Sequence, residues 1–417
     1  TSLKMAPPYV VSSFREHTSK LGFFSECPIQ WDKKRECLRY KSPKGNVKVK
    51  IWHLNMFISV DSITAGAFVY DIFQIVRATP EEPYMPLPIK LILALLGVLS
   101  YYVVVIHVMV TLYGKDAVNG WNEMVKLEGQ VVGRMGHVGG GVTSMPHESH
   151  ATLPATLIFL VRSFSIYRFV ILPSEFFMKF DAFYFPLRDL KETYQLTQST
   201  ILILNVLRFT ILIVNVFEIC RALSLVILLF ISAINLVRSI FSVLLHESER
   251  CFVSMARING GITTHLTAQL AMKAFAPFQE LGSFFLILMG LVVFLVSNFV
   301  TIKLFDSLPI PVYAFFPSVS VVVALVINLT LPLAHGLLDV STELKRRYGA
   351  LMVGESNQFE LKCERRRLKG MRPFCLWAGI GGSKMFRLNK ETKMQYFEQV
   401  VTGTVTMLLS TDDGFLE

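Results

Sequence analysis

The stretch LNKETKMQYFEQVVTGTVTMLLSTDDGFLE, residues 388–417, decides the fold. It carries no formal charge between Glu398 and Asp412, so it can form a short membrane-spanning helix. Hydroxyl and amide side chains nevertheless recur along it, and a helix that faces only lipid does not need them. The side of the membrane on which this last segment ends decides whether the whole chain crosses an odd or an even number of times.

The composition of the whole chain is that of a membrane protein. Its 417 residues are 52% hydrophobic and 17% charged, with a mean hydropathy of +0.48. Soluble chains are about 45–50% apolar and about 25% charged. The excess gathers in long uncharged runs, such as the 24 residues between Lys90 and Lys115. Because a helix needs roughly 20 apolar residues to cross about 30 Å of hydrocarbon, we predict an all-α polytopic membrane protein.

Seven runs qualify as transmembrane helices. The first carries Asp61 and Asp71, and charges inside a span usually face the bundle interior or a wet cavity. The fourth run contains neither Pro nor Gly to reverse the chain, so we predict one long helix that continues into the cytoplasm. Between the second and third runs we expect a separate short amphipathic helix and a loop. The predicted spans are about 54–76, 88–113, 152–175, 200–245, 281–302, 311–335 and 392–411.

The distribution of charge gives the orientation. Residues 1–50 hold eleven basic residues against four acids, and residues 335–393 hold thirteen against six. The short turns at 76–90 and 303–310 hold two basic residues and one, and no basic residue follows Ser410. Lys and Arg favour the cytoplasmic side. The N-terminus is therefore predicted inside and the C-terminus outside, which requires an odd number of crossings; eight would place the second basic block outside.

These assignments divide the chain into five parts. We expect a cytoplasmic N-terminal segment (1–53), six helices with their loops (54–335), a basic cytoplasmic helical anchor (336–391), the seventh helix (392–411) and an extracellular tail (412–417). The opening residues show no signal-peptide pattern. They also lack an initiator Met, so we expect the natural chain to begin slightly earlier. The predicted location is the plasma membrane.

The last third of the chain resembles one known family. The run LAMKAFAPFQELGSFFLILMGLVVFLV (270–296) is similar to the entry into the fifth helix of arthropod gustatory and odorant receptors, which are seven-helix ligand-gated channels. The basic segment and final helix, 361–410, are similar to that family's cytoplasmic anchor and short seventh helix. The seventh-helix signature departs from the family: with its Thr at Thr402, Gly403 stands for Tyr, and Leu409 and Ser410 stand for Gln-Phe.

The resemblance implies a function and partners. It implies a gustatory-receptor-like cation channel, opened by a small-molecule ligand, embedded in the lipid bilayer and assembled as a homo- or hetero-tetramer. One short pore helix per chain cannot enclose a pathway, which also favours four copies. The alternative is a G-protein-coupled receptor or a secondary transporter acting as a single chain. We find neither the sequence motifs of the former nor the internal repeats of many transporters.

Polar residues of the final helix fall on one face. Gln399, Thr402, Thr406 and Ser410 recur at three- and four-residue steps. Two interpretations stay open. The hydroxyls can serve helix packing and bond their own backbone, as is common in membranes. If the family resemblance holds, they line a pore.

The pore interpretation also predicts an apolar ring and an outer vestibule from the positions of neighbouring residues. Val405 or Leu408 would form an apolar gating ring in a hydroxyl-walled cation pathway. Asp412 and Asp413 would form an outer vestibule that attracts cations.

The ligand site implied by the resemblance lies among the outer halves of the helices before the seventh. Such pockets are mostly apolar with a few polar groups. Two of the candidates, Tyr313 and Phe316, have an open alternative as aromatic anchors at the membrane boundary. The expected ligand residues are Tyr167, Arg168, Asn298, Tyr313 and Phe316.

Several other functions are not expected. The net charge of +10 comes mostly from two basic blocks beside apolar runs, so the positive-inside rule explains it better than nucleic-acid binding. The two His of HESH (147–150) lack a third ligand, so no metal site is predicted. We find no catalytic constellation and no cofactor motif, and we predict neither enzymatic activity nor a cofactor.

Overall fold

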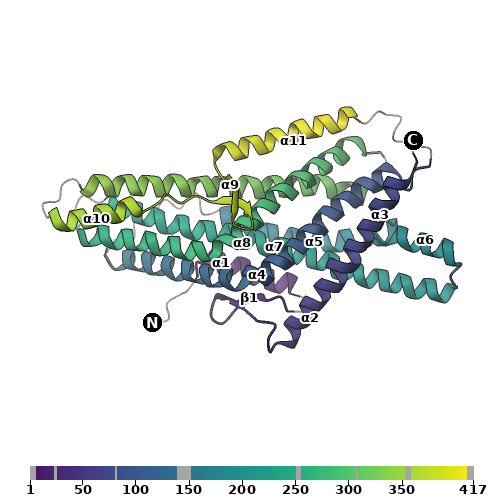
Figure 1. The fold of residues 1–417 in the computed structure, drawn as a ribbon, viewed down its shortest axis with the longest axis horizontal. Helices are drawn as coiled ribbons and strands as arrows, with labels where there is room; N and C mark the ends of the chain where they lie inside the picture. Colours follow the sequence, from purple (N-terminus) through teal and green to yellow (C-terminus); the bar gives the residue numbers. More distant parts are fainter. Residues whose placement is uncertain are drawn as a thin grey trace.

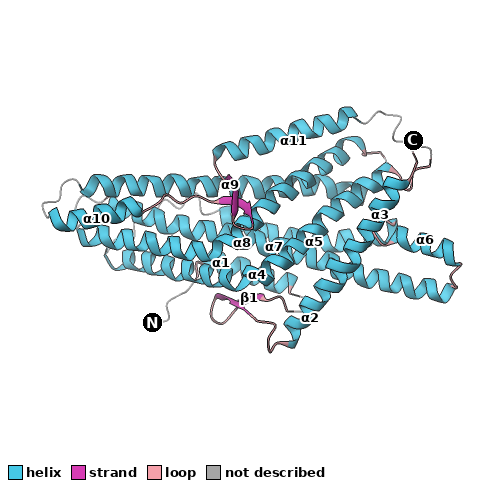
Figure 2. Ribbon diagram, viewed as in Figure 1, coloured by secondary structure: helices cyan, strands magenta, loops and turns pink. Residues whose placement is uncertain are grey.

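The computed structural model describes residues 6–22, 26–79, 82–138, 152–249, 255–306, 308–352 and 358–410. Within these ranges the chain is a bundle of long helices with two small β-hairpins (Figures 1 and 2). The elements are α1 (Pro8–Leu21), β1 (Ile29–Asp32), β2 (Cys37–Tyr40), α2 (Val47–Asn55), the π-helix η1 (Met56–Thr64), α3 (Ala65–Arg77), α4 (Leu87–Val138), α5 (Thr152–Met178), α6 (Tyr184–Tyr194), α7 (Gln198–Ser248), α8 (Met255–Lys303), α9 (Ile310–Leu351), α10 (Gln358–Gly370), β3 (Trp377–Ile380), β4 (Ser383–Arg387) and α11 (Lys390–Ser410).

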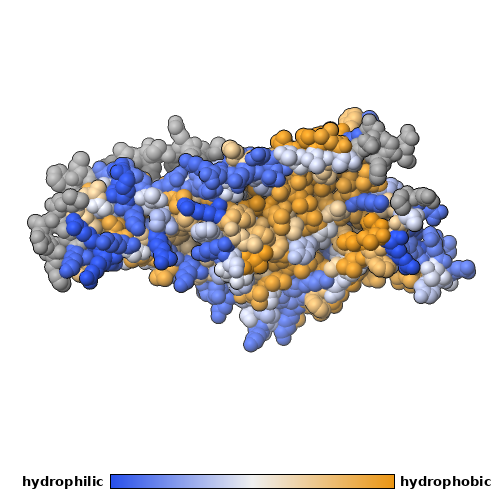
Figure 3. Space-filling view, turned by 45° about the horizontal axis from the view of Figure 1, so that its top comes forward, coloured by the Kyte–Doolittle hydropathy of each residue, from blue (hydrophilic) through white to orange (hydrophobic). Residues whose placement is uncertain are grey.

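Apolar helices confirm the polytopic membrane fold. Six described stretches are long and apolar enough to cross a bilayer. The seventh predicted span, α11, is not one of them because the charged and amide side chains of its first half lower its mean hydropathy. With 21 residues it is still about 31 Å long, which matches the hydrocarbon thickness. Apolar side chains form a band across the surface between more polar ends (Figure 3). The six stretches are Val47–Arg77, Leu87–Arg134, Leu153–Met178, Gln198–Ser248, Met255–Lys303 and Val312–Leu351.

Three helices are far longer than a membrane is thick. α4, α7 and α8 have 52, 51 and 49 residues, about 75 Å each, so a large part of each lies outside a bilayer. The separate amphipathic helix expected after the second span is instead the continuation of α4. The backbones of α4 and α8 approach each other closely at Gly120, where a Cβ would lie 2.6 Å from the carbonyl oxygen of Ala271. This close packing beyond the membrane span supports the continuation of α4 as one helix alongside α8.

α7 forms the centre of the bundle. It is one unbroken helix, as its lack of Pro and Gly predicted, and 72% of its most apolar window is buried. It packs against α4, α5 and α9. Because α7 is apolar on nearly all sides, it can be surrounded by other helices of the same chain.

Three charged residues of α7, Arg208, Glu218 and Arg221, are buried in ion pairs. Arg208 donates from Nε to the carboxylate of Asp181 at 3.0 Å, in the segment between α5 and α6. Glu218 pairs with Arg221 one turn along α7 and accepts a hydrogen bond from the indole nitrogen of Trp52 at 3.3 Å. Removing one partner of such a pair leaves a buried charge uncompensated. These pairs therefore constrain the packing of the helices that supply them.

The anchor segment contains a hairpin that the sequence did not predict. β3 and β4 are antiparallel and joined by Gly381 and Gly382. Both glycines have positive φ, +59° and +84°, as tight hairpin turns require. The hairpin contacts α8, where the side-chain amide of Gln279 donates to the carbonyl oxygen of Trp377 at 3.0 Å. The chain then turns directly into α11 (Figure 1).

Candidate functional site

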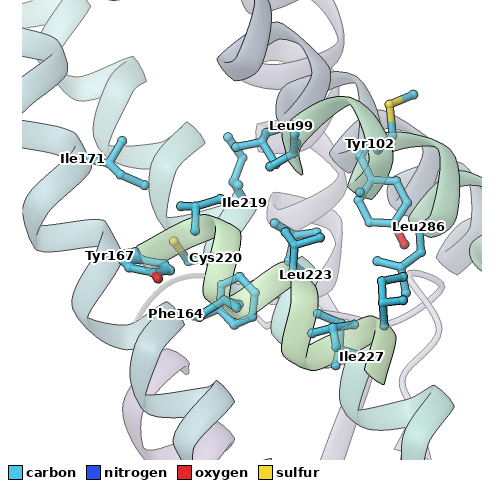
Figure 4. Close-up of a pocket in the computed structure, with 18 of the residues that line it drawn as sticks. Leu99, Tyr102, Phe164, Tyr167, Ile171, Ile219, Cys220, Leu223, Ile227 and Leu286 are labelled. Carbon is cyan, nitrogen blue, oxygen red and sulfur yellow. The ribbon is translucent and has the colours of Figure 1, made fainter. Parts of the chain in front are cut away.

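Five helices surround an internal cavity of about 100 Å³. α4, α5, α7, α8 and α9 each contribute side chains to its wall (Figure 4). An engineered cavity of about 150 Å³ lined by aliphatic and aromatic residues binds benzene, so this one is of the size of a small ring or a short chain. Wall residues from the first three helices include Leu99, Tyr102, Phe164, Tyr167, Ile219 and Leu223.

The wall of the cavity is almost entirely apolar, and none of the residues that line it is charged. The polar atoms come from two tyrosines and from Cys220. The hydroxyl of Tyr102 is directed to the carbonyl oxygen of Gly282 at 3.4 Å. The ring of Tyr167 packs edge-on against Phe315, with centroids 5.5 Å apart. Such a wall suits an uncharged ligand bound mainly by burial of apolar surface.

Two of the five predicted ligand residues lie at cavities. Tyr167 lines the main cavity. Phe316 lines an adjoining cavity of about 30 Å³, whose wall also includes Ile171 and Phe315. Those two residues also line the main cavity, so the two spaces are neighbours on the α5–α9 side.

The other three predicted ligand residues do not line the main cavity, and their polar groups contact other parts of the bundle. Arg168 donates to the carbonyl oxygen of Lys20 at 2.8 Å, and its guanidinium lies 4.7 Å from the ring centre of Phe169. Asn298 accepts a hydrogen bond from Ser320 at 2.9 Å. The hydroxyl of Tyr313 donates to the carbonyl oxygen of Thr301 at 3.0 Å. Asn298 and Tyr313 thus connect α8 to α9.

Most of the cavity wall was not predicted from the sequence. Ile219, Leu223 and Ile227 line it from α7 at four-residue steps, which place them on one helix face. No amphipathic pattern could identify that face, because the helix is apolar almost all round. Of the α7 residues that line the cavity, Cys220 is the one that is not aliphatic.

The final helix, α11, is packed on one side only. Tyr396, Val400 and Thr404 are buried, and the helix contacts α8 and α9. Phe397 adds an edge-on contact to Phe294 of α8. In Figure 1, α11 lies along the outside of the bundle. The opposite side of α11 is exposed in the described part of the chain.

The predicted pore residues lie mostly on that open side. Gln399, Thr402, Thr406 and Ser410 are all exposed. The hydroxyl of Thr406 donates to the carbonyl oxygen of Thr402 at 2.9 Å, so its donor is used while its oxygen can still accept from water. A continuous polar stripe therefore runs along the open face of α11.

The two candidates for an apolar ring differ in exposure. Val405 is 47% exposed, whereas Leu408 is half-buried and packs against the apolar cluster that α8 and α9 share. Asp412 and Asp413, the predicted vestibule, lie outside the described residues. The HESH segment (147–150) does so too.

Helix α8 lies between the cavity and α11, and at Gly290 it contacts both. Gly290 lines the cavity, and a Cβ at this position would lie 3.2 Å from the hydroxyl oxygen of Tyr396 on α11. That hydroxyl is buried and has no hydrogen-bond partner among the described residues. A change in the cavity wall at Gly290 would therefore act directly on the packing of α11.

Within the described ranges, no group of three or more His, Cys, Asp or Glu side chains is arranged to hold a metal ion. The apolar lining of the cavity suits binding of an apolar molecule, and Gly290 brings the cavity wall into contact with α11.

Comparison with known proteins supports the fold. No family model matches the chain, and no curated protein matches its sequence. Among solved structures, it is similar to the insect olfactory receptor OR5 from Machilis hrabei, with a TM-score of 0.56 and 11% identity over 97% of this chain and 98% of that chain. A structure of the same receptor in complex with eugenol aligns over the same shares, with 11% identity and a TM-score of 0.49. The first likeness shows a shared fold along nearly the whole length.

Proposed function

We propose that this protein is a chemosensory ligand-gated cation channel of the insect odorant and gustatory receptor superfamily. The observation that carries the proposal is the one-sided packing of α11, whose exposed face bears a continuous polar stripe. In a fold shared along its length with an olfactory receptor, such a helix is suited to line a pathway built by several copies.

Four copies of α11 would enclose the pathway. The stripe of Gln399, Thr402, Thr406 and Ser410 would face the ions, and oxygen atoms of these side chains would replace part of their hydration. Val405 is the better candidate for the apolar ring, because Leu408 packs into its own subunit. The tetramer can be built from identical or related subunits in the plasma membrane, with the N-terminus and the anchor segment in the cytoplasm.

The ligand would be a small, uncharged and largely apolar molecule. A volume of about 100 Å³ and a wall without charges favour a single ring or a short aliphatic chain. Binding would act on α11 through Gly290 and Tyr396, since a ligand that displaces α8 here changes the surface on which α11 packs.

Cysteine accessibility on α11 tests the pore. Gln399→Cys, Thr402→Cys and Thr406→Cys would each be expressed in cells, and ligand-evoked currents recorded before and after a membrane-impermeant cationic thiol reagent. We expect the reagent to reduce the current in all three. Val400→Cys and Thr404→Cys are controls on the same helix, because both side chains are buried where α11 contacts α8 and α9. Modification of the controls alone would exclude the polar stripe as the ion pathway.

Orientation and selectivity need separate measurements. An epitope tag after Glu417 should be reached by antibody on intact cells, because the proposed C-terminus is extracellular. Protection of the tag until the cells are permeabilised would reverse the topology. Charge reversal of Asp412 and Asp413 should lower cation conductance, and unchanged currents would remove the vestibule from the proposal.

A further inference from the structure

A second cavity lies between the first membrane helix and α4. It is a groove of about 500 Å³ that is lined by residues of η1, α3 and α4 and by Met289 of α8. Its rim is open toward the surroundings of the bundle, since Val69 and Tyr101 are 67% and 52% exposed. Because this part of the chain lies among apolar membrane helices, the groove opens to lipid.

One buried carboxylate lines this mostly apolar groove, whose other polar lining residues are Lys90, Ser100 and Tyr101. Asp71 lines it from α3 and is only 3% exposed. Neither of its oxygens accepts a hydrogen bond from any described residue. A buried carboxylate without such donors is costly, and ionisable residues inside membrane spans commonly mark binding sites or ion paths.

The charged neighbours of Asp71 are already paired with one another. Asp181, Asp189 and Arg188 are the groups that act on it electrostatically. Arg208 holds Asp181, and Arg188 lies 3.0 Å from Asp189. The hydroxyls of Tyr70 and Tyr84 also donate to Asp189, at 2.9 and 2.6 Å. Asp71 is therefore the carboxylate in this cluster whose oxygens remain open to a further donor.

We propose that the groove binds an amphiphile with a primary ammonium group and an alkyl chain. The ammonium would donate to Asp71, and the chain would lie along α4 toward Met289, past Gly97 and Val104. Charge-assisted hydrogen bonds to a carboxylate in a low-dielectric site are strong, which compensates the burial of both charges. A free alkylamine and the amino headgroup of a lipid share this chemistry.

Lys90 is the competing partner within the chain. It lines the same groove from the first turn of α4, and rotation of its side chain could bring its ammonium closer to Asp71. If Lys90 were the partner of Asp71, an added amine would find the site occupied. A variant without this ammonium therefore distinguishes a ligand site from an internal ion pair.

Photolabelling of the full-length protein tests the proposal. The protein would be placed in phosphatidylcholine nanodiscs and exposed to dodecylamine with a diazirine in its chain, and labelled peptides mapped by mass spectrometry. We expect labelling on α3 and α4 that excess dodecylamine prevents and excess dodecanol does not. Equal competition by the alcohol would overturn the proposal, and this wild-type comparison does not depend on any variant folding.

Matched variants separate the roles of charge and space. Asp71→Asn should reduce amine labelling by about tenfold and leave labelling by the matching diazirine alcohol unchanged, whereas Asp71→Glu should retain both. Gly97→Leu should reduce both labels because its side chain fills the groove beside Phe68. Amine labelling that Asp71→Asn leaves intact, or that appears only in Lys90→Met, would overturn the proposal.

The source of the amine is decided in the same assay. Competition of the label by phosphatidylethanolamine added to the nanodiscs would assign the site to a lipid headgroup. Competition by dodecylamine alone would assign it to a free amine.

Discussion

α7 and α11 are both helices of the membrane domain, but they bury their surfaces differently. α7 is surrounded by other helices of its own chain, and its charges Arg208, Glu218 and Arg221 are paired inside the bundle. α11 buries one face and leaves its polar stripe exposed. Substitutions in α7 should therefore act on folding, whereas substitutions on the open face of α11 should act on assembly and conduction.

The largest effect on stability should come from breaking the buried ion pair between Arg208 of α7 and Asp181. Arg208 and Asp181 are 6% and 1% exposed, so Arg208→Ala leaves a buried carboxylate without its partner. We expect a loss of about 3–5 kcal/mol in the free energy of unfolding. The thermal midpoint of the detergent-purified protein, followed by size-exclusion chromatography after heating, measures it.

Two controls accompany this variant. Arg208→Met combined with Asp181→Leu removes both charges and should recover most of the loss. Lys390→Ala removes an ion pair at the start of α11 whose side chains are 72% and 56% exposed, and should leave the midpoint unchanged. If Lys390→Ala destabilised the protein as much as Arg208→Ala, the contrast between the two helices would fail.

A pH dependence should appear where α1 packs on α7. The pKa of His17 is lowered to about 4, mainly by burial. A contact at 3.4 Å with the Arg221 carbonyl oxygen opposes this shift in part, and the positive charge of Arg221 contributes to it. The folded state thus favours neutral His17. Its contribution to stability is complete above the unfolded pKa of about 6.5 and is lost as the pH falls toward 4.

The expected loss for His17 is at most about 3 kcal/mol. Thermal midpoints between pH 7.5 and 4.5 would be compared with those of His17→Gln, which does not titrate. Because carboxylates also titrate in acid, the difference between the two curves is the quantity to follow. Parallel curves would show that α1 packs on α7 independently of this ring.

Alanine substitutions at two glycines compare the packing around α7 with that around α11, with smaller expected effects on stability. A Cβ at Gly282 of α8 would overlap Phe230 of α7 and lie 2.7 Å from Met109. A Cβ at Gly403 of α11 would meet the end of the Leu295 side chain at 2.6 Å, which can rotate away. We expect Gly282→Ala to cost about 1–3 kcal/mol.

For Gly403→Ala the two contributions oppose each other. Displacement of Leu295 costs free energy, while Ala is better than Gly in a helix by about 1 kcal/mol, so the net change should be within about 1 kcal/mol of zero. Thermal midpoints measure both variants. A larger loss for Gly403→Ala than for Gly282→Ala would mean that α11 packs more tightly than α7 and α8.

The sequence predicted the features that depend on hydropathy and on chain reversal. Long uncharged runs identified the membrane helices, and the absence of Pro and Gly identified α7 as one helix. The continuation of α4 was missed because it depends on close contact at Gly120, and the β3–β4 hairpin because its strands have only four and five residues. Contacts between distant segments leave little trace in a single sequence.

The candidate site was less predictable than the fold for a related reason. Of the expected ligand residues, Tyr167 lines the main cavity, while Arg168, Asn298 and Tyr313 make contacts elsewhere in the bundle. The prediction selected polar and aromatic residues, whereas the cavity wall consists mostly of aliphatic residues. In the sequence, such residues cannot be distinguished from those of a hydrophobic core. The polar stripe of α11 was predictable because three- and four-residue spacing is visible in the sequence.

The smallest expected effect on stability is also the most informative about α11. Thr406→Val removes an exposed hydroxyl that donates only to its own helix, so stability should change by no more than about 0.5 kcal/mol. Under the proposed function this hydroxyl faces the ions, and single-channel conductance should fall. Thr404→Val is the matched control, because its hydroxyl likewise donates to the helix, at Val400, but faces α8 and α9. A fall in conductance for Thr404→Val and none for Thr406→Val would mean that α11 turns its buried side to the pathway when the channel opens, and the division of this helix into a packed face and a pore face would have to be reversed.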